Sequence, residues 1–498
     1  MPEARMTVDP AFSVGTVDPR VYGSFVEHLG RCVYTGIYEP DHPEADSDGF
    51  RQDVGRLVSE LGVPIIRYPG GNFVSGYRWE DGIGPKDARP QRLDLAWRSI
   101  ETNAVGTDEF CRWTRQVGSE PMLAVNLGTR GPDAAARLVE YCNHPSGTYW
   151  SDLRAKNGSV DPHGVKVWCL GNEMDGEWQI GHKTADEYGR IATETAKAMK
   201  LVDPYIQLVA CGSSNSRMPT FGDWEATVLE HCYEHVDYIS LHSYYQERKG
   251  DRASFLACAI DMDRFIADVI STVDHVRAKG RHQKRINLSF DEWNVWYTIG
   301  QHSDRDWEEA PRLIEDEYNL TDAVVVGNLL ISLLRRADRV HMACLAQLVN
   351  AIAAIRTEPG GAAWRQTIFH PFALTSRYGR GTVLQTPISS PEYDTSWFGA
   401  VPVLDGVTVQ NDDGAVTVFA VNRDQNSALP LTVDLRSLPE LRKATHTYLG
   451  DDDPAATNTE AAPDRVIPRS GPESTVDDGI LQVTLPPLSW NMLRVTRS

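Results

Sequence analysis

The sequence predicts an α/β protein in which a (β/α)₈ TIM barrel is combined with an all-β sandwich. Between about residues 20 and 350, short apolar runs alternate with longer segments of helical period, as in repeated βα units. Beyond residue 386 the pattern changes to short alternating segments joined by turn residues, which is typical of a β-sandwich. Two glutamates, Glu173 and Glu292, lie at the ends of two of the apolar runs, where TIM barrels carry their active sites.

Eight apolar runs are the predicted barrel strands. They are Val21–Val26, Pro64–Tyr68, Met122–Leu127, Val165–Leu170, Gln207–Cys211, Tyr238–Leu241, Ile286–Phe290 and Val340–Leu345. The segments between them predict helices over 48–61, 107–118, 131–143, 184–202, 222–235, 254–279 and 317–336. Thr184 and Glu187 have the spacing of a capping box, and Pro204 indicates where that helix has ended.

The remaining segments predict the sandwich. A Pro/Ser-rich stretch at 386–391 reads as a linker, and Asn411–Gly414 predicts a hairpin between two alternating strands. Residues 5–16 are strand-like and precede the first barrel strand, so we expect them to join the sandwich. The predicted domains are therefore 1–19 (strand segment of the sandwich), 20–385 (barrel) and 386–498 (sandwich). The segment 451–479, rich in Asp, Pro, Ala and Thr, is expected to be a mobile surface loop.

Composition narrows the class of function. The chain has 498 residues, 41% hydrophobic and 24% charged, as in a soluble globular enzyme. Its formal net charge of −20 argues against nucleic-acid or anionic-membrane partners, which require basic surfaces, and fits a neutral substrate such as a sugar. The first residues do not resemble a secretory signal, and no apolar run is long enough to span a membrane. The eight cysteines form no close pair and no zinc pattern, so we expect reduced thiols, no metal site and a cytoplasmic protein.

Glu173 and Glu292 are the candidate catalytic residues. Two carboxylates at strand ends can serve as the acid and the nucleophile of glycoside hydrolysis. For Glu173 the alternative is a solvated carboxylate that caps the next helix. For Glu292 it is an ion pair at the rim, and Asp291 remains an alternative nucleophile because adjacent strand residues point to opposite faces. The aromatic residues after Glu292 favour Glu292 as the one that points inward.

Other side chains are candidates for binding the sugar. His242 and Tyr244 are two apart on a strand and share a face, so both can lie beside Glu292, although a lone His at a strand end is often structural. Asn172 could bond a sugar hydroxyl, and Asn72 follows Gly70-Gly71, which let the backbone approach the pocket or form an ordinary turn. The remaining candidates are Glu27 at the first strand end, Gln347 after the last strand, and Trp97, Trp178 and Trp296, which could stack on sugar or lie in the core.

With these residues in view, the chain resembles the intracellular α-L-arabinofuranosidases of glycoside hydrolase family 51 over nearly its whole length. The runs that carry the resemblance are Phe25–His28, Arg67–Tyr77, Trp79–Pro85, Leu95–Trp97, Gly171–Gly176, Asp291–Asn294 and Pro486–Asn491.

The resemblance implies a retaining barrel enzyme with a jelly-roll sandwich. It implies Glu173 as acid/base, Glu292 as nucleophile, and Glu27, Asn72 and Asn172 as ligands of the arabinofuranosyl ring. His242, Tyr244 and Gln347 would support the nucleophile and the sugar. It also implies a hexamer, an arabinofuranosyl oligosaccharide as substrate, and no metal or organic cofactor. The alternatives are another retaining glycosidase on the same barrel, such as an endoglucanase or β-xylosidase, and a non-catalytic sugar-binding protein.

Overall fold

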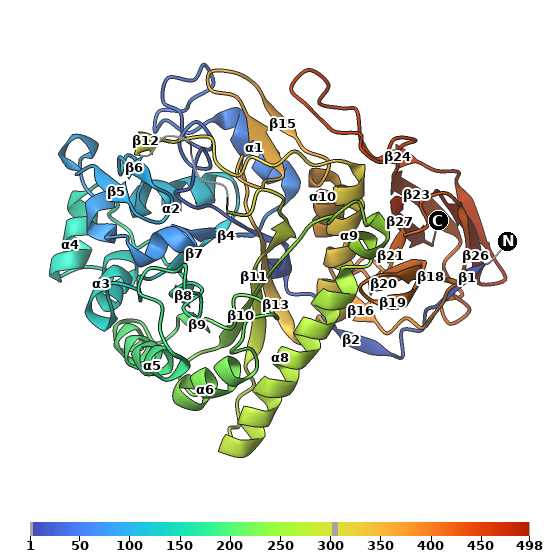
Figure 1. The fold of residues 1–498 in the computed structure, drawn as a ribbon, viewed down its shortest axis with the longest axis horizontal. Coiled ribbons are helices and arrows are strands. Elements are labelled where there is room, and N and C mark those ends of the chain that lie inside the picture. The colour runs from blue at the N-terminus through green and yellow to red at the C-terminus, as the bar shows by residue number, and fades with distance from the viewer. Residues whose placement is uncertain (1–2, 301–306, 498) are drawn as a thin grey trace.

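The protein is described from a computed structural model, which covers residues 3–300 and 307–497. A barrel and a β-rich part lie side by side, and helices surround the barrel (Figure 1). All eight predicted strands form, each hydrogen-bonded in parallel to its neighbours, and the barrel closes where β13 pairs with β3. The barrel strands are β3 (Gly23–Phe25), β4 (Ile65–Tyr68), β7 (Glu120–Ala124), β8 (Val167–Leu170), β9 (Gln207–Ala210), β10 (Tyr238–Tyr245), β11 (Asn287–Val295) and β13 (Val340–Leu345).

The predicted helices form with shifts of a few residues at their ends, and the capping box of Thr184 and Glu187 is present. The helices are α1 (Gln52–Leu61), α2 (Thr107–Gln116), α3 (Pro132–Asn143), α4 (Tyr149–Lys156), α5 (Ala185–Val202), α6 (Asp223–Cys232), α7 (Arg252–Leu256), α8 (Ala259–Gly280), α9 (Leu320–Arg335) and α10 (Phe369–Tyr378). Short 3₁₀ helices are η1 (Pro19–Tyr22), η2 (Asn72–Ser75), η3 (Trp79–Gly82) and η4 (Lys86–Ala88).

Three helical segments differ from the prediction. The segment 254–279 is divided into α7 and α8. Neither α4, between α3 and β8, nor α10, which follows the last barrel strand, was predicted. Pro371 obscured α10 in the sequence, although a proline is tolerated in the first helical turn, where no intrahelical acceptor is lost.

The β-rich part contains a large, mostly antiparallel sheet that folds into two layers. Residues of β1, β22 and β26 share one hydrophobic core with residues of β21 and β27, as the sandwich prediction requires. Its strands are β1 (Ala4–Thr7), β2 (Ser13–Thr16), β16 (Thr382–Leu384), β17 (Ile388–Ser389), β20 (Leu404–Gln410), β21 (Val416–Asn422), β22 (Leu429–Asp434), β23 (Lys443–Leu449), β24 (Arg469–Ser470), β25 (Ser474–Asp477), β26 (Ile480–Leu485) and β27 (Ser489–Thr496).

The N-terminal strands join this sheet, as expected, because β1 pairs with β22 and β2 pairs with β16. The predicted hairpin at 411–414 links β20 and β21. The sheet already includes β16, which precedes the predicted linker, and the boundary at 385/386 and the jelly-roll connectivity stay predictions. Smaller pairings involve β5 (Arg92–Asp94), β6 (Ser99–Glu101), β12 (Glu308–Glu309), β14 (Ile355–Thr357), β15 (Ala363–Arg365), β18 (Glu392–Thr395) and β19 (Gly399–Pro402).

The segment 451–479 is more structured than the loop predicted for it. It contains β24 and β25, and it buries Ala456 and Val466. The carbonyl of Ala456 accepts a hydrogen bond from the backbone N–H of Leu320 at the start of α9. The prediction of a plain surface loop is therefore wrong for these parts, because local composition does not reveal a contact made more than a hundred residues away.

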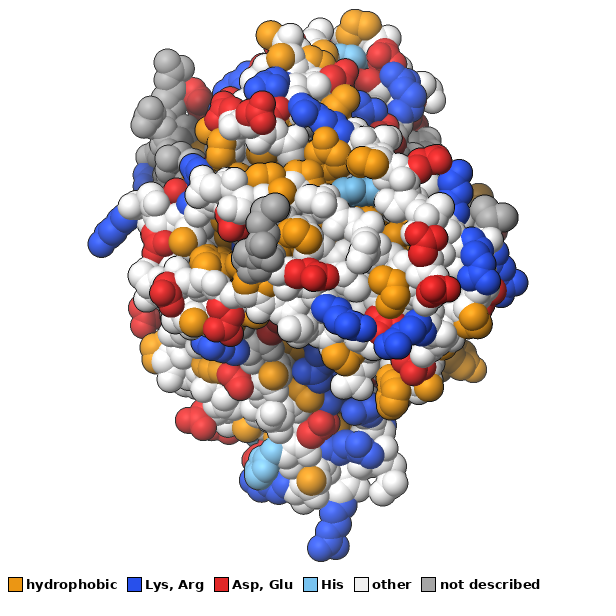
Figure 2. Space-filling model, turned by 90° about the vertical axis from the view of Figure 1, so that its right-hand side faces the viewer, with side chains coloured by type: hydrophobic (Ala, Val, Ile, Leu, Met, Phe, Trp, Pro, Cys, Tyr) orange, Lys and Arg blue, Asp and Glu red, His pale blue; other side chains and the backbone are white. Residues whose placement is uncertain are grey.

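The helix α9 packs against the sheet, and its Gly327 explains how. A Cβ at Gly327 would lie 2.2 Å from Cδ1 of Trp490 in β27, so only glycine lets the indole approach this closely. Figure 2 shows the side of the molecule formed by the β-rich part, where acidic and basic side chains are interspersed. No helix in the described part of the chain is both long and apolar enough to cross a membrane.

Candidate active site

The predicted site residues gather at one end of the barrel. Glu27 follows β3, Glu173 follows β8, and Glu292 lies near the end of β11. Because the carboxyl ends of parallel barrel strands meet at one face, these carboxylates enter a common cavity of about 510 Å³. Asn72, Trp97, Trp178, Tyr244, Trp296 and Gln347 also line it.

His242 joins the two candidate catalytic carboxylates. Its Nδ1 donates to Oε1 of Glu173 at 2.9 Å and lies 3.7 Å from Oε2 of Glu292. One oxygen of each carboxylate and a ring nitrogen of His242 all lie within 4.8 Å of one another. His242 is buried behind the cavity rather than in its lining, so its contacts are with the carboxylates. Glu173 itself has a φ of +43°, which is uncommon for a residue other than glycine and is a mark of functional sites.

The proton affinities of this group are strongly perturbed. Burial lowers the pKa of His242, but the charge of Glu292 and hydrogen bonds to Asp291 and Glu173 more than offset it and raise the pKa to about 10. The pKa of Glu173 is raised above its ordinary value of 4.5, first by burial and then by the charge of Glu292, against hydrogen bonding from His242. At neutral pH the arrangement favours an imidazolium beside a carboxyl that holds its proton more tightly than usual.

Two donors hold Glu292. Arg67, in β4, donates from Nη1 to Oε1 at 2.6 Å, and Tyr244 donates its hydroxyl proton to Oε2 at 2.8 Å. The same guanidinium donates from Nη2 to Oδ1 of Asn172 at 2.6 Å, so Arg67 aligns both residues. Charge-assisted bonds of this kind are short and directional, so they fix the orientation of the carboxylate.

Asp291 also points into the barrel, because the strand pairing is irregular here. The register between β10 and β11 shifts between Ser240 and His242, which leaves an extra residue on β11. Asp291 accepts a hydrogen bond from Nε2 of His242 at 2.9 Å and is almost fully buried. Its pKa is lowered because Arg67 and His242 outweigh the effect of burial. Unlike Glu292, it is not among the residues that line the cavity.

Glu27 is held by three donors. Its Oε1 accepts from the backbone N–H of Phe73 and from Nε1 of Trp97, both at 3.0 Å, and its Oε2 accepts from Nε2 of Gln347 at 2.9 Å. Burial nevertheless raises the pKa of Glu27 to about 8. Among the described residues, Oε1 of Gln347 has no hydrogen-bond partner, so this buried oxygen can accept a hydrogen bond from a ligand hydroxyl.

The turn Gly70-Gly71-Asn72 follows β4 and lines the same cavity. A Cβ at Gly71 would lie 3.0 Å from Oε1 of Glu292 and 3.3 Å from Nδ2 of Asn172. Position 71 therefore requires glycine because the backbone lies close to the Glu292 carboxylate, and not only because the turn is tight.

The three tryptophans differ in exposure. Trp97 is buried against Glu27, and Trp296 packs edge to face with Tyr244 at a centroid distance of 4.9 Å. Trp178 is 51% exposed, and its Nε1 donates to Oε2 of Glu173 at 2.6 Å. Stacking of these rings on sugar stays a prediction.

Arg67 and Gln179 were not predicted as site residues, and Asp291 was considered only as an alternative nucleophile. Gln179 accepts from Nδ2 of Asn172 at 3.4 Å and donates to Oγ of Ser75 at 2.6 Å. The sequence could have indicated Arg67, because it is the one charged residue in the run Ile65–Tyr68. A buried arginine requires an anionic partner, which would have suggested a nearby carboxylate. Gln179 had no such signal.

Glu173, His242 and Glu292 could in principle offer three ligand atoms to a cation. However, Nδ1 and Nε2 of His242 both face carboxylate oxygens at 2.9 Å, and its raised pKa leaves no free lone pair at neutral pH. The donor set therefore fits hydrogen bonding better than metal ligation, and the expected lack of a metal stays a prediction.

The chain is similar to known proteins over its whole length. Residues 57–255 match the model of an α-L-arabinofuranosidase 1 domain, and residues 291–489 match an α-L-arabinofuranosidase C-terminal domain. A protein of Streptomyces lividans named intracellular exo-α-(1→5)-L-arabinofuranosidase is 59% identical, over 99% of this chain and 75% of that protein. A Bacillus subtilis protein of that name is 57% identical over the full length of both. The solved structure of a family 51 α-L-arabinofuranosidase from Bifidobacterium longum covers all of both chains with a TM-score of 0.96 and 48% identity.

Proposed function

Because this chain belongs to the α-L-arabinofuranosidases of glycoside hydrolase family 51, we propose that it releases terminal arabinofuranosyl residues by double displacement with net retention. The observation that carries the mechanism is the short separation of the two carboxylates, within 4.8 Å for one oxygen of each. Retaining glycosidases keep their carboxyl groups about 5–5.5 Å apart, whereas inverting enzymes leave room for a water.

In the first step, ionised Glu292 attacks the anomeric carbon while Glu173 gives its proton to the departing glycosidic oxygen. The C–O bond to the leaving group breaks as the ester bond to Glu292 forms. Burial raises the pKa of Glu173 most, and the charge of Glu292 raises it further. This raised pKa supports the role of Glu173 as the acid.

In the second step, water attacks the same carbon, Glu173 takes its proton, and Glu292 leaves as a carboxylate. Formation of the ester removes the charge of Glu292, which removes one cause of the raised pKa of Glu173. The imidazolium of His242, 2.9 Å from Glu173, then stabilises the ionised form that acts as base.

Glu27, Asn72, Asn172 and Gln347 are proposed to bind the hydroxyls of the furanose ring, while His242 and Tyr244 support the carboxylates. Trp97 and Trp296 would contact the ring. Oligosaccharides containing terminal arabinofuranose are the proposed substrates, and the names of the relatives favour α-1,5-linked chains in the cytoplasm. A hexamer is proposed as well, and light scattering after size-exclusion chromatography tests it.

Substitution of Glu173 tests the acid/base role. Glu173→Ala is expected to slow substrates with poor leaving groups by about 10²–10⁴-fold and aryl substrates with good leaving groups far less, since the latter need no proton. Steady-state kinetics on arabino-oligosaccharides and nitrophenyl arabinofuranoside measure this. Equal losses on both would remove Glu173 from that role.

Covalent trapping tests the nucleophile. Glu292→Ala is expected to lose nearly all turnover, and a mechanism-based arabinofuranosyl inhibitor should label Glu292 in the parent enzyme. Peptide mapping by mass spectrometry locates the label. A label on Asp291 would transfer the role to that residue.

A panel of aryl glycosides separates the proposed activity from the alternatives. Hydrolysis of the α-L-arabinofuranoside alone supports the proposal, while turnover of β-xyloside or cellooligosaccharide would favour the other retaining glycosidases. A sugar-binding protein would release no aryl group at all.

A further inference from the structure

Two isoleucines with strained backbones lie together in the wall of the catalytic cavity. Ile314 has a φ of +44° and Ile352 a φ of +37°, both are nearly fully buried, and both line the cavity. Left-handed backbone is a genuine outlier for β-branched residues, and it persists only where the surroundings impose it. The N–H of Ile352 donates to the carbonyl of Ile314 at 2.8 Å, so the two segments are joined directly.

The backbone of Ile352 is held by the strand ends that carry the candidate catalytic groups. Its carbonyl accepts from Nδ2 of Asn294 at 2.6 Å and from the N–H of Gln347 at 3.0 Å. Asn294 lies two residues after Glu292 in β11, and the side chain of Gln347 donates to Glu27. The conformation of Ile352 is thus coupled to the position of two pocket carboxylates.

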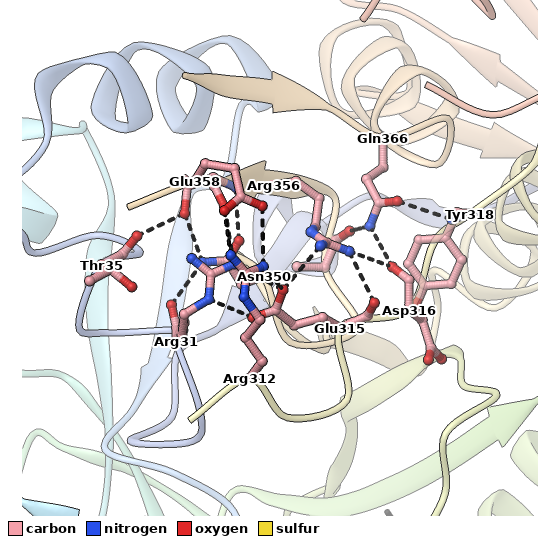
Figure 3. A network of polar contacts seen from close by, with 12 residues as sticks. Arg31, Thr35, Arg312, Glu315, Asp316, Tyr318, Asn350, Arg356, Glu358 and Gln366 are labelled. Carbon is pink, nitrogen blue, oxygen red and sulfur yellow. Dashed lines mark hydrogen bonds and ion pairs between the residues drawn. The ribbon is translucent and has the colours of Figure 1, made fainter. Parts of the chain in front are cut away.

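The backbone next to Ile314 is held by a buried ionic network (Figure 3). Arg31 donates to the carboxylate of Glu315 from Nε at 2.7 Å and from Nη2 at 2.9 Å. Arg356 donates to that carboxylate at 3.0 Å and to the carbonyl of Glu315 at 3.0 Å. These residues come from the segments after β3, between β11 and α9, and in β14, so the network ties three loops together around the wall.

The network has further polar support on both sides. Asn350 donates to the carbonyl of Arg31 at 2.9 Å, and Asp316 accepts from the N–H of Tyr297 at 2.6 Å. A flexible loop would relax to an unstrained backbone, whereas this one is fixed by hydrogen bonds from several directions.

The wall formed by Ile314 and Ile352 differs chemically from the hydrogen-bonding residues that line the same cavity. Ile314 and Ile352 present only hydrocarbon, while Glu27, Asn72 and Gln347 offer hydrogen-bonding groups. A substrate hydroxyl pressed against the wall would lose water without gaining a partner, which is unfavourable.

We propose that Ile314 and Ile352 are specificity-determining residues that restrict the sugar pocket to a five-carbon furanose, with Arg31, Glu315 and Arg356 as the positioning residues that hold them. The proposal rests on the arabinofuranosidase function proposed above. A hexofuranose of the same ring configuration carries one more hydroxymethyl group, and the hydrocarbon of the wall offers no hydrogen-bond partner to its hydroxyl.

The test compares two nitrophenyl glycosides, the α-L-arabinofuranoside and the β-D-galactofuranoside, which differ by that hydroxymethyl group. In Ile314→Ala and Ile352→Ala, the ratio of kcat/KM for the arabinofuranoside to that for the galactofuranoside is expected to fall at least about tenfold. Ile314→Leu and Ile352→Leu, which keep the volume, should retain the ratio of the parent. Ile270→Ala, on α8 and outside the cavity, is the control for loss of a buried isoleucine and should also retain it.

Glu315→Gln tests the positioning residues. It is expected to lower the same ratio, whereas a merely structural role would reduce thermal stability and both kcat/KM values in proportion. Ile352→Gly serves if the alanine variant does not fold, because glycine removes the side chain and tolerates the positive φ.

If folded variants at both isoleucines keep the parent's ratio of the two kcat/KM values, Ile314 and Ile352 do not determine specificity. If Glu315→Gln keeps that ratio, the ionic network does not position them. These failures are distinct from failure of the proposed function. A parent enzyme that does not hydrolyse the arabinofuranoside would remove the function itself, while an active parent with unmoved ratios removes only the specificity assignment.

Discussion

At the scale of single residues, the site balances buried charges of both signs. Asp291 and Glu292 face Arg67, while His242 lies between Glu173 and Asp291. An unpaired charge at this depth would be costly, so each group depends on the others for its ionisation. Asp291, which does not line the cavity, shares His242 with Glu173 and thereby favours the protonated ring.

The raised pKa of His242 predicts how stability depends on pH. A pKa of about 10 in the folded protein, against an ordinary value of 6.5, stabilises the fold fully below about pH 6.5. This stabilisation is lost as pH rises toward 10, by on the order of 5 kcal/mol in total. The free energy of unfolding of the parent, measured relative to His242→Gln by urea titration, should therefore decline between these pH values.

His182→Gln, the same substitution at an exposed histidine, is the matched control and should follow the parent at every pH. Parallel pH dependence of the parent and His242→Gln would show that the His242 proton does not stabilise the fold.

At the scale of elements, the irregular pairing of β10 and β11 and the turn after β4 together form the centre of the site. The register shift lets both Asp291 and Glu292 contact groups inside the barrel, which regular alternation would forbid. The glycine turn brings backbone close enough to limit where the Glu292 carboxylate can lie.

Gly71→Ala is expected to lower kcat/KM by about 10–100-fold with little loss of stability. The added Cβ would lie 3.0 Å from Oε1 of Glu292, and small displacements of a catalytic group are costly to the rate. Steady-state kinetics and thermal melts of the same samples measure both effects.

Gly55→Ala, in α1, is the control, because its Cβ would meet nothing closer than 3.7 Å. It should leave kcat/KM unchanged and raise stability by about 0.5–1 kcal/mol, the usual gain of alanine over glycine inside a helix. An unaltered kcat/KM in Gly71→Ala would contradict the close-approach argument.

At the scale of the whole molecule, α9 connects the barrel to the sheet through a charged cluster. Asp405 in β20 pairs with Arg335 at the end of α9 and accepts from Nη2 of Arg423 and Nδ2 of Asn328, each at 2.8 Å. The two arginines lower the pKa of Asp405 although burial alone would raise it. The ion pairs thus stabilise the contact between the two parts.

Asp405→Asn is expected to lower the free energy of unfolding by about 3 kcal/mol, because it leaves two arginines without their shared carboxylate. The lowered pKa means that this stabilisation is present above about pH 4, the ordinary Asp value, and is lost as pH falls through the folded pKa. Denaturant unfolding at pH 7 and at acidic pH measures the difference.

Asp412→Asn, at an exposed hairpin position on the next turn of the same sheet, should change stability by less than about 0.5 kcal/mol. If Asp405→Asn and Asp412→Asn proved equally stable at pH 7, the ion pairs of Asp405 would not stabilise the contact between α9 and the sheet.

Much of this architecture could be predicted from local sequence. The eight barrel strands, most of their helices and the N-terminal contribution to the sheet follow from apolar periodicity and turn residues, which are short-range properties. Two helices, α4 and α10, were missed, and α10 has in its first turn a proline that resembles a helix break. Arg67 could have been suspected from its apolar run, but its partner Glu292, 225 residues away, could not be identified from local sequence.

The sequence by itself determined the order of strands and placed Glu27, Glu173 and Glu292 at strand ends, since those features depend on neighbours along the chain. Only the tertiary structure decided that His242 lies between two carboxylates, that Asp291 shares it, and that Ile314 and Ile352 are held at positive φ. The physical reason is that strand register, backbone strain and proton affinity depend on contacts between distant segments. Such contacts exist only once the barrel has closed.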